Sequence, residues 1–188
     1  MEPMKSRRGF VLYLILSLAL AFSITAEPLS AQKEKRDPLT QAEVEKIREA
    51  GIDPVERVKL YTEFVNDHVS TVKALTNRGK SASRSRRLDD ELQDVTALMD
   101  ELGTNLDVYS DRHADIRASL KPLTVAAQQW LSALKALAGE PGFDLSRKEA
   151  IESGQDLADQ AERLLREQTD YFNLHKDERG QERAEPKN

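Results

Sequence analysis

The side chains best suited to binding a ligand are two histidines and two tyrosines near the ends of predicted helices. Folding of the last part of the chain about its proline-glycine break places His113 level with Tyr171. The same geometry places His175 level with Tyr109. Imidazole groups with aspartates close by suit Zn²⁺ or Cu²⁺. The sequence therefore predicts either a metal site held by the two histidines, with the two tyrosines available to a small ligand, or a lid of amphipathic side chains that closes the bundle end.

Outside this group, the sequence contains no arrangement typical of an enzyme. It lacks the Glu-x-x-His pair of di-iron bundles, the His-Glu-x-x-His and Gly-x-Ser-x-Gly motifs, a phosphate-binding glycine loop and any cysteine. The third histidine, His68, falls among valines, where a buried imidazole hydrogen-bonded to a neighbour is the simplest interpretation. We therefore expect a protein without catalytic activity and without a cofactor.

A basic, serine-rich stretch is the other candidate site. Its members are Arg78, Lys80, Arg84, Arg86 and Arg87. Three acidic residues, at positions 89–91, follow directly. The stretch predicts either a patch that binds an anionic glycan, a lipid head group or an acidic partner surface, or a solvated loop neutralised by the adjacent acids. Aromatic residues are scarce around it, which argues against single-stranded nucleic acid as a ligand.

The first 31 residues have the three parts of a secretory signal peptide. A basic head at positions 5–8 precedes an apolar run at positions 10–22, and small residues follow at Ala26 and Ala31. The run is shorter than the roughly 20 residues that a membrane-spanning helix needs. We predict cleavage after Ala31, with Ala26 as the alternative, and export to the periplasm or the extracellular space. Contact with the membrane is then limited to this segment.

Residues 6–10, Ser-Arg-Arg-Gly-Phe, resemble the twin-arginine export motif. The resemblance implies transport of an already folded protein. Leu12 stands where that motif often has Lys, and the leucine-rich core also suits the general secretion route, so both routes stay open. Because the chain has no cysteine, it can carry no lipoprotein anchor, and its stability must come from helix packing rather than disulfides.

Composition indicates an acidic, all-α protein. The chain has 188 residues, of which 32% are charged and 5% aromatic. Loss of the signal peptide removes three basic and two acidic residues and leaves 25 and 31, a net charge of −6. A charge of that sign does not favour nucleic-acid binding. Helix-forming residues dominate, and alternating apolar patterns typical of strands are missing.

Helix signals divide the mature chain into a polar linker at 32–38, a helical bundle domain at 39–175 and a charged tail at 176–188, which is predicted to be disordered. Thr40 with Glu43, and Asp53 before Pro54, predict the starts of the first two helices. Ser146 with its acidic partner three residues later predicts the start of the last helix.

Apolar residues recur at spacings of three and four from Val58 to Leu75 and again from Leu88 to Leu137. Weak helix breakers at 103–105 and 110–111 favour an up-down-up-down four-helix bundle preceded by a short helix. The alternative is one long kinked helix flanked by two hairpins. In either case the register of the final hairpin places Trp130 opposite Gly154, so that leucine at position 154 would overpack the core.

The sequence therefore predicts an exported, non-enzymatic interaction or structural protein of the cell envelope. Its expected partner is another envelope protein or a second copy of the chain. The alternative is a carrier for a small ligand or a metal ion, which would use the tyrosine and histidine cluster.

Overall fold

The computed structural model describes residues 37–179. These residues form five α-helices and one short 3₁₀ turn, and they contain no strand: α2 (Gln41–Glu49), α3 (Pro54–Thr76), α4 (Ala82–Asp111), α5 (Arg117–Ala136), α6 (Asp144–Leu174) and η1 (Lys176–Glu178). The predicted all-α class is confirmed. The predicted signal peptide, the first part of the linker and residues 180–188 of the tail lie outside the described residues. Within the described part, no helix has the length and apolar character needed to cross a membrane.

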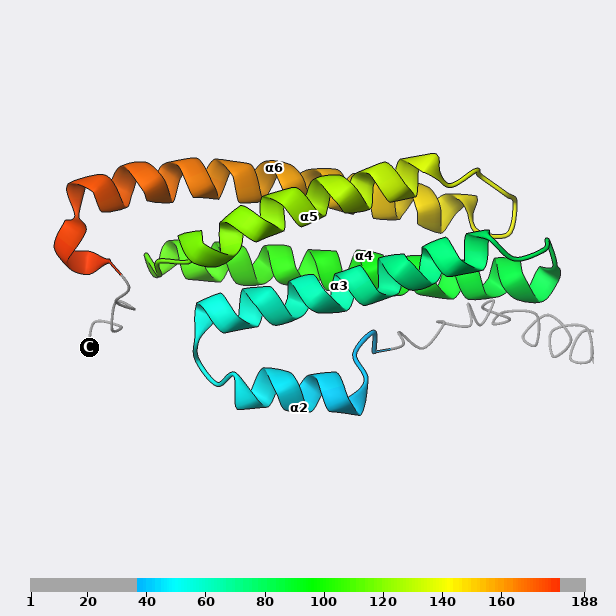
Figure 1. Ribbon diagram of the computed structural model, residues 1–188, viewed down its shortest axis with the longest axis horizontal. Helices are drawn as coiled ribbons and strands as arrows, with labels where there is room; N and C mark the ends of the chain where they lie inside the picture. The colour runs from blue at the N-terminus through cyan, green and yellow to red at the C-terminus, as the bar shows by residue number, and fades with distance from the viewer. Residues whose placement is uncertain (1–36, 180–188) are drawn as a thin grey trace, which may run out of the picture. The chain divides into compact units, whose positions relative to one another are not determined.

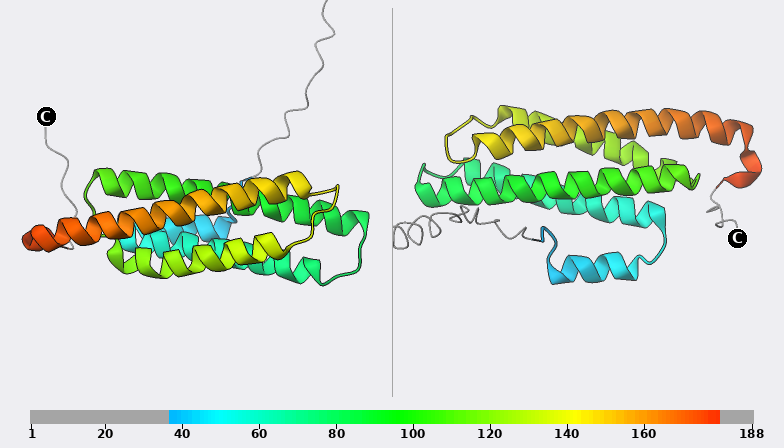
Figure 2. Two further views of the ribbon diagram at one scale, coloured as in Figure 1. Left: turned by 90° about the horizontal axis from the view of Figure 1, so that it is seen from above. Right: turned by 180° about the vertical axis from the view of Figure 1, so that it is seen from behind.

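The four long helices pack into a bundle of two antiparallel hairpins (Figure 1). In this view the chain runs from left to right in α3 and α5 and from right to left in α4 and α6, which is the alternating, up-down-up-down order of the favoured prediction. Among these described helices, α3 contacts α4 and α5, and α6 contacts the same two, whereas α4 does not pack against α5. The link between α4 and α5 therefore crosses the diagonal of the bundle. As a result α4 and α6 lie side by side and run parallel, as the view from behind shows (Figure 2).

The break in the middle of the chain falls at the second predicted group of weak breakers, residues 110–111, rather than at the first. Helix α4 continues through residues 103–105 and ends at Asp111. At Gly103 a side chain would meet the Gln160 Oε1 atom at 3.0 Å, and Gln160 donates a 3.0 Å hydrogen bond to the Gly103 carbonyl. This glycine therefore leaves room for the Gln160 side chain of α6 and does not interrupt the helix.

Two of the three predicted helix starts are confirmed. The Thr40 side chain accepts from the Glu43 amide, and the Glu43 carboxylate accepts from the Thr40 amide, which completes a capping box. Asp53 caps α3 with Pro54 at its first position. The predicted cap of the last helix is wrong, because α6 begins at Asp144. Ser146 is buried and donates instead to a carboxylate on α4.

The core is formed by apolar side chains from all four long helices, and the register predicted at Gly154 is shifted by one residue. Gly154 is buried, but the atoms nearest to a Cβ built there belong to Leu131, at 3.3 Å, and Met99, at 3.5 Å. The predicted neighbour, Trp130, directs its indole toward α3, where its Nε1 donates to the Asn66 Oδ1 atom at 2.6 Å. The predicted close packing at Gly154 is present, but the residue of α5 that contacts it is Leu131 and not the adjacent Trp130.

Helix α2 lies outside the four-helix bundle and packs only on α3 (Figure 1). None of its residues is fully buried, although Ile47 contacts the core. At the other end of the described chain, residues 176–178 form a 3₁₀ turn, and Arg179 donates a 2.8 Å hydrogen bond to the Phe172 carbonyl. The first residues of the predicted disordered tail are thus held against the end of α6.

Candidate functional site

The tyrosine and histidine residues of the predicted end cluster gather around Tyr171. Its ring centroid lies 5.0 Å from that of His113 and 4.2 Å from that of His175, and the second pair is stacked. The Tyr171 hydroxyl donates to Glu178 in the 3₁₀ turn at 2.7 Å. Tyr109 belongs to the buried core instead. The structure therefore brings three of the four predicted residues together.

The stack consists of amphipathic side chains that contact one another through their rings. Both imidazoles contact the Tyr171 ring, and the Nδ1 atom of His175 donates to the Tyr171 carbonyl at 2.9 Å. Beside the stack is a cavity of about 230 Å³, which is lined by Ser110, His113, Glu167, Gln168, Tyr171 and Phe172. A metal site held by His113 and His175 stays a prediction. The converging metal-ligand group found among the described residues lies elsewhere in the bundle.

Gln168 on α6 holds the diagonal link between α4 and α5 in place. It is buried, with 7% of its surface exposed. Its Oε1 accepts from the Ile116 amide at 3.1 Å, and its Nε2 donates to the Ala114 carbonyl at 2.9 Å. Gln168 is not among the residues predicted from the sequence. A signal was present, since Gln168 interrupts the apolar spacing that includes Leu164 and Phe172.

His113 has an unusual backbone conformation. Helix α4 ends in a Schellman motif, in which the Ala114 amide bonds the Tyr109 carbonyl and the His113 amide bonds the Ser110 carbonyl, both at 2.9 Å. His113 occupies the position that is usually glycine and has φ of 54°. A side chain with this φ is strained by about 1–2 kcal/mol.

Replacing His113 with glycine should give a free energy of unfolding about 0.5–1 kcal/mol above that of His113→Ala. Both variants lose the contact with the Tyr171 ring, but only glycine relieves the strain, and part of that gain is offset by its larger backbone entropy in the unfolded chain. Urea unfolding followed by circular dichroism at 222 nm measures the difference. The matched variant His113→Ala keeps the strained backbone and loses the ring contact, so it should be less stable than the parent. A glycine variant less stable than the alanine variant would contradict this account.

The basic stretch does not form one exposed patch. Arg84 is buried, with its Nε donating to the Leu75 carbonyl at 3.0 Å and its guanidinium bound to Glu140 at 3.2 Å. Lys80 is exposed and also pairs with Glu140, at 3.6 Å. The remaining members, Arg78, Arg86 and Arg87, are exposed. The prediction that Arg84 belongs to an anion-binding patch is therefore wrong, because the residue joins α3, α4 and the loop before α6.

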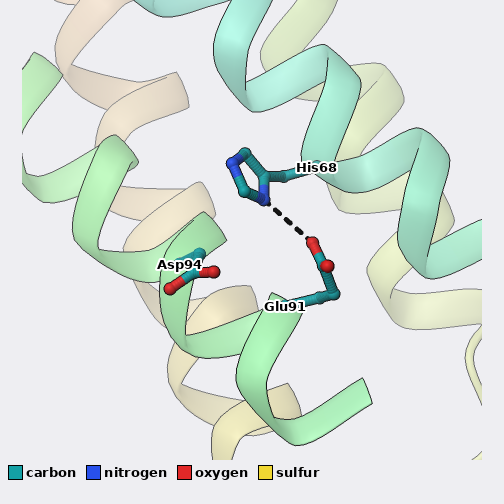
Figure 3. Close-up of side chains that lie close together, drawn as sticks. All are labelled: His68, Glu91 and Asp94. Carbon is teal, nitrogen blue, oxygen red and sulfur yellow. Dashed lines mark hydrogen bonds and ion pairs between the residues drawn. The ribbon is translucent and has the colours of Figure 1, made fainter. Parts of the chain in front are cut away.

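His68 forms a polar cluster with two acidic residues of α4 (Figure 3). Its Nδ1 lies 2.9 Å from the Glu91 Oε2 atom, and Asp94 completes a group whose ligand atoms all lie within 4.8 Å of one another. The predicted hydrogen bond to a neighbouring side chain is confirmed, although His68 is half-buried rather than fully buried. Neither acidic partner is among the residues predicted from the sequence. Their spacing of three residues, which places them on one helical face, was the available signal.

The outer face of α5 differs from the rest of the surface. Residues 122–134 contain no charged residue and no histidine, in a chain of which 32% is charged. Val125 is 59% exposed on this face. An open groove of about 610 Å³ runs between α5 and α6 and is lined by Thr124, Val125, Gln128, Gln129, Ser132, Glu162, Leu165 and Arg166. Comparison of the chain with protein-family models, with curated proteins and with solved structures gives no match.

Proposed function

We propose that this chain is an exported, non-catalytic interaction protein that self-associates through the outer face of α5 and the groove between α5 and α6. The observation that carries the proposal is the absence of charge from residues 122–134, together with the exposure of Val125. Depletion of charged residues distinguishes the centre of a protein interface from the remaining surface. The helical core is filled by apolar side chains, which suits a scaffold that presents its surface to a partner.

The charges along the rim of the groove favour a second copy of this chain as the partner. Glu162 and Arg166 lie one helical turn apart on α6. The Arg166 Nη1 atom is 3.7 Å from the Glu162 Oε2 atom. The side chain of Arg166 is 70% exposed and that of Glu162 is 46% exposed, so the pair contributes little within one chain. A two-fold axis across the groove would place Arg166 of one copy opposite Glu162 of the other and repeat the contact symmetrically. The uncharged face of α5 would then form the centre of the interface.

The test is the mass of the mature protein in solution, measured by light scattering after size-exclusion chromatography. We expect the parent to have twice the mass of one chain at about 10 µM, a typical working concentration for a moderately stable dimer. Val125→Glu should give a monomer because it places like charges at the centre of the interface. The matched control is Leu145→Glu, at an apolar side chain that is 70% exposed elsewhere. It should leave the dimer intact. A parent that is monomeric at all concentrations, or two variants that dissociate equally, would refute self-association.

The exported location is tested separately. Mature protein recovered outside the cytoplasm should begin at Gln32 or at Glu27, the residues that follow the two predicted cleavage positions. Intact-mass spectrometry distinguishes the two. Exported material with Met1 still in place would contradict the proposed signal peptide and leave the self-association experiment unaffected.

A further inference from the structure

We propose that His68, Glu91 and Asp94 bind one divalent transition-metal ion, with Zn²⁺ as the probe. The site lies between α3 and α4, on the flank of the bundle (Figure 3). It is distinct from the tyrosine and histidine end and from the groove between α5 and α6. The inference therefore does not depend on the proposed self-association.

The ligands come from two helices that are packed against each other. Helix α3 supplies His68, and α4 supplies Glu91 and Asp94 from one face, three residues apart. The contact between these helices continues at the core residues on either side, Val65 and Val95, which are fully buried. Ligands held on two packed helices are oriented before the ion arrives, which lowers the ordering cost of binding.

The distances suit a small ion after side-chain rotation alone. The His68 Nδ1 atom lies 2.9 Å from Glu91 Oε2, and the ligand atoms of all three residues lie within 4.8 Å of one another. Around a tetrahedral Zn²⁺, nitrogen and oxygen ligands at about 2.1 Å from the ion are separated by roughly 3.4 Å. Shifts of about 1 Å in the side chains therefore reach this geometry. The helices need not move.

The chemistry of the three groups selects a transition metal over Ca²⁺ or Mg²⁺. An imidazole with two carboxylates suits Zn²⁺ and its neighbours, whereas Ca²⁺ and Mg²⁺ prefer sets of oxygen atoms alone. Three protein ligands leave a fourth position for water. The side chain of His68 is 17% exposed and that of Glu91 is 21% exposed, so the ion can reach the site from solvent.

Burial increases the electrostatic gain from a cation. Asp94 is 7% exposed, and the two carboxylates lie in a partly buried environment, where charge interactions are stronger than in water. A protonated His68 would neutralise one negative charge of the cluster. A divalent ion would neutralise two and would bind the imidazole in its neutral form.

The experiment is a Zn²⁺ titration of the mature protein after chelator treatment, followed by isothermal calorimetry and by thermal unfolding. We expect one ion per chain and a rise in Tm of about 5–10 °C when free Zn²⁺ exceeds its Kd a hundredfold. Mg²⁺ and Ca²⁺ at the same concentration should produce no comparable shift. Glu91→Gln and Asp94→Asn, which change charge and hardly change size, should each weaken Zn²⁺ binding by at least tenfold while the circular dichroism spectrum stays that of the parent.

The matched control is the double variant His113→Ala and His175→Ala, which removes both histidines of the bundle end. It should bind Zn²⁺ as the parent does. Loss of binding in this control together with full binding in Glu91→Gln would locate the ion at the other end and overturn the proposal. A parent without calorimetric binding at millimolar Zn²⁺ would also overturn it.

Discussion

Replacing Arg84 with methionine should lower the free energy of unfolding by about 3 kcal/mol, because it removes one partner of a buried ion pair. The change leaves the Glu140 carboxylate, whose side chain is 16% exposed, without its guanidinium. It also removes one donor to the Leu75 carbonyl in the last turn of α3, which keeps its hydrogen bond from the Arg78 amide at 3.1 Å. Lys80 keeps one contact with Glu140 from a position that is 80% exposed, so it compensates only in part. Urea unfolding at pH 7 measures the loss.

The matched control for Arg84 is Arg87→Met, three residues further along α4. Arg87 is exposed, and its replacement should change the free energy of unfolding by less than about 0.5 kcal/mol. A double-mutant cycle with Glu140→Gln isolates the pair itself, and we expect a coupling free energy of about 1.5–3 kcal/mol. Equal effects of the Arg84 and Arg87 substitutions would show that Arg84 is an ordinary surface residue.

The sequence could not separate Arg84 from its basic neighbours, because the difference arises from a residue far away in the chain. Arg84 and Arg87 stand in the same serine-rich stretch with similar surroundings. Only the fold brings Glu140, from the loop before α6, to the first turn of α4. Local patterns report propensity and periodicity, while the burial of a charged side chain depends on tertiary contacts.

Periodicity determined most of the architecture that could be predicted. The apolar spacing from Val58 to Leu75, and again from Leu88 onward, places helical faces in the core without further information. It does not say which helices become neighbours, and the diagonal link between α4 and α5 was therefore not foreseen. The position of the break was also obscured, since the left-handed residue at the end of α4 is His113, where glycine would have marked the end of the helix.

The two polar clusters also differ in how far the sequence could predict them. Hairpin register was sufficient to bring His113 and Tyr171 together, because both lie at the same level of the bundle. The partner of His68 required knowledge of side-chain direction. The sequence predicted a hydrogen bond from His68 to an unnamed neighbour among valines, and the structure shows that this partner is Glu91 on α4. A long polar side chain can reach a residue one helical turn away. Helix register therefore predicts contacts between such side chains less accurately than contacts in the apolar core.

Replacing Gln168 with leucine should lower the free energy of unfolding by about 2–3 kcal/mol, although leucine is the more apolar residue and suits a helix well. Two buried backbone groups in the link between α4 and α5 lose their partners, the Ile116 amide and the Ala114 carbonyl. Each buried group left unpaired costs about 1–3 kcal/mol, and the added apolar burial offsets part of the sum.

Gln160→Leu is the matched control for this prediction, because it changes the same residue type on the same helix. The Gln160 side chain also bonds α4, at the Gly103 carbonyl and at Asp107, but it is only half-buried. Water can replace those bonds, so we expect a cost below about 1 kcal/mol. Hydrogen exchange supplies a second measurement. The Ile116 amide should exchange at least tenfold faster in Gln168→Leu and remain unchanged in Gln160→Leu. Suppose that Gln168→Leu has the free energy of unfolding of the parent and an unchanged exchange rate at the Ile116 amide. The link would then be held by its apolar contacts, and the hydrogen bonds of Gln168 would not stabilise it.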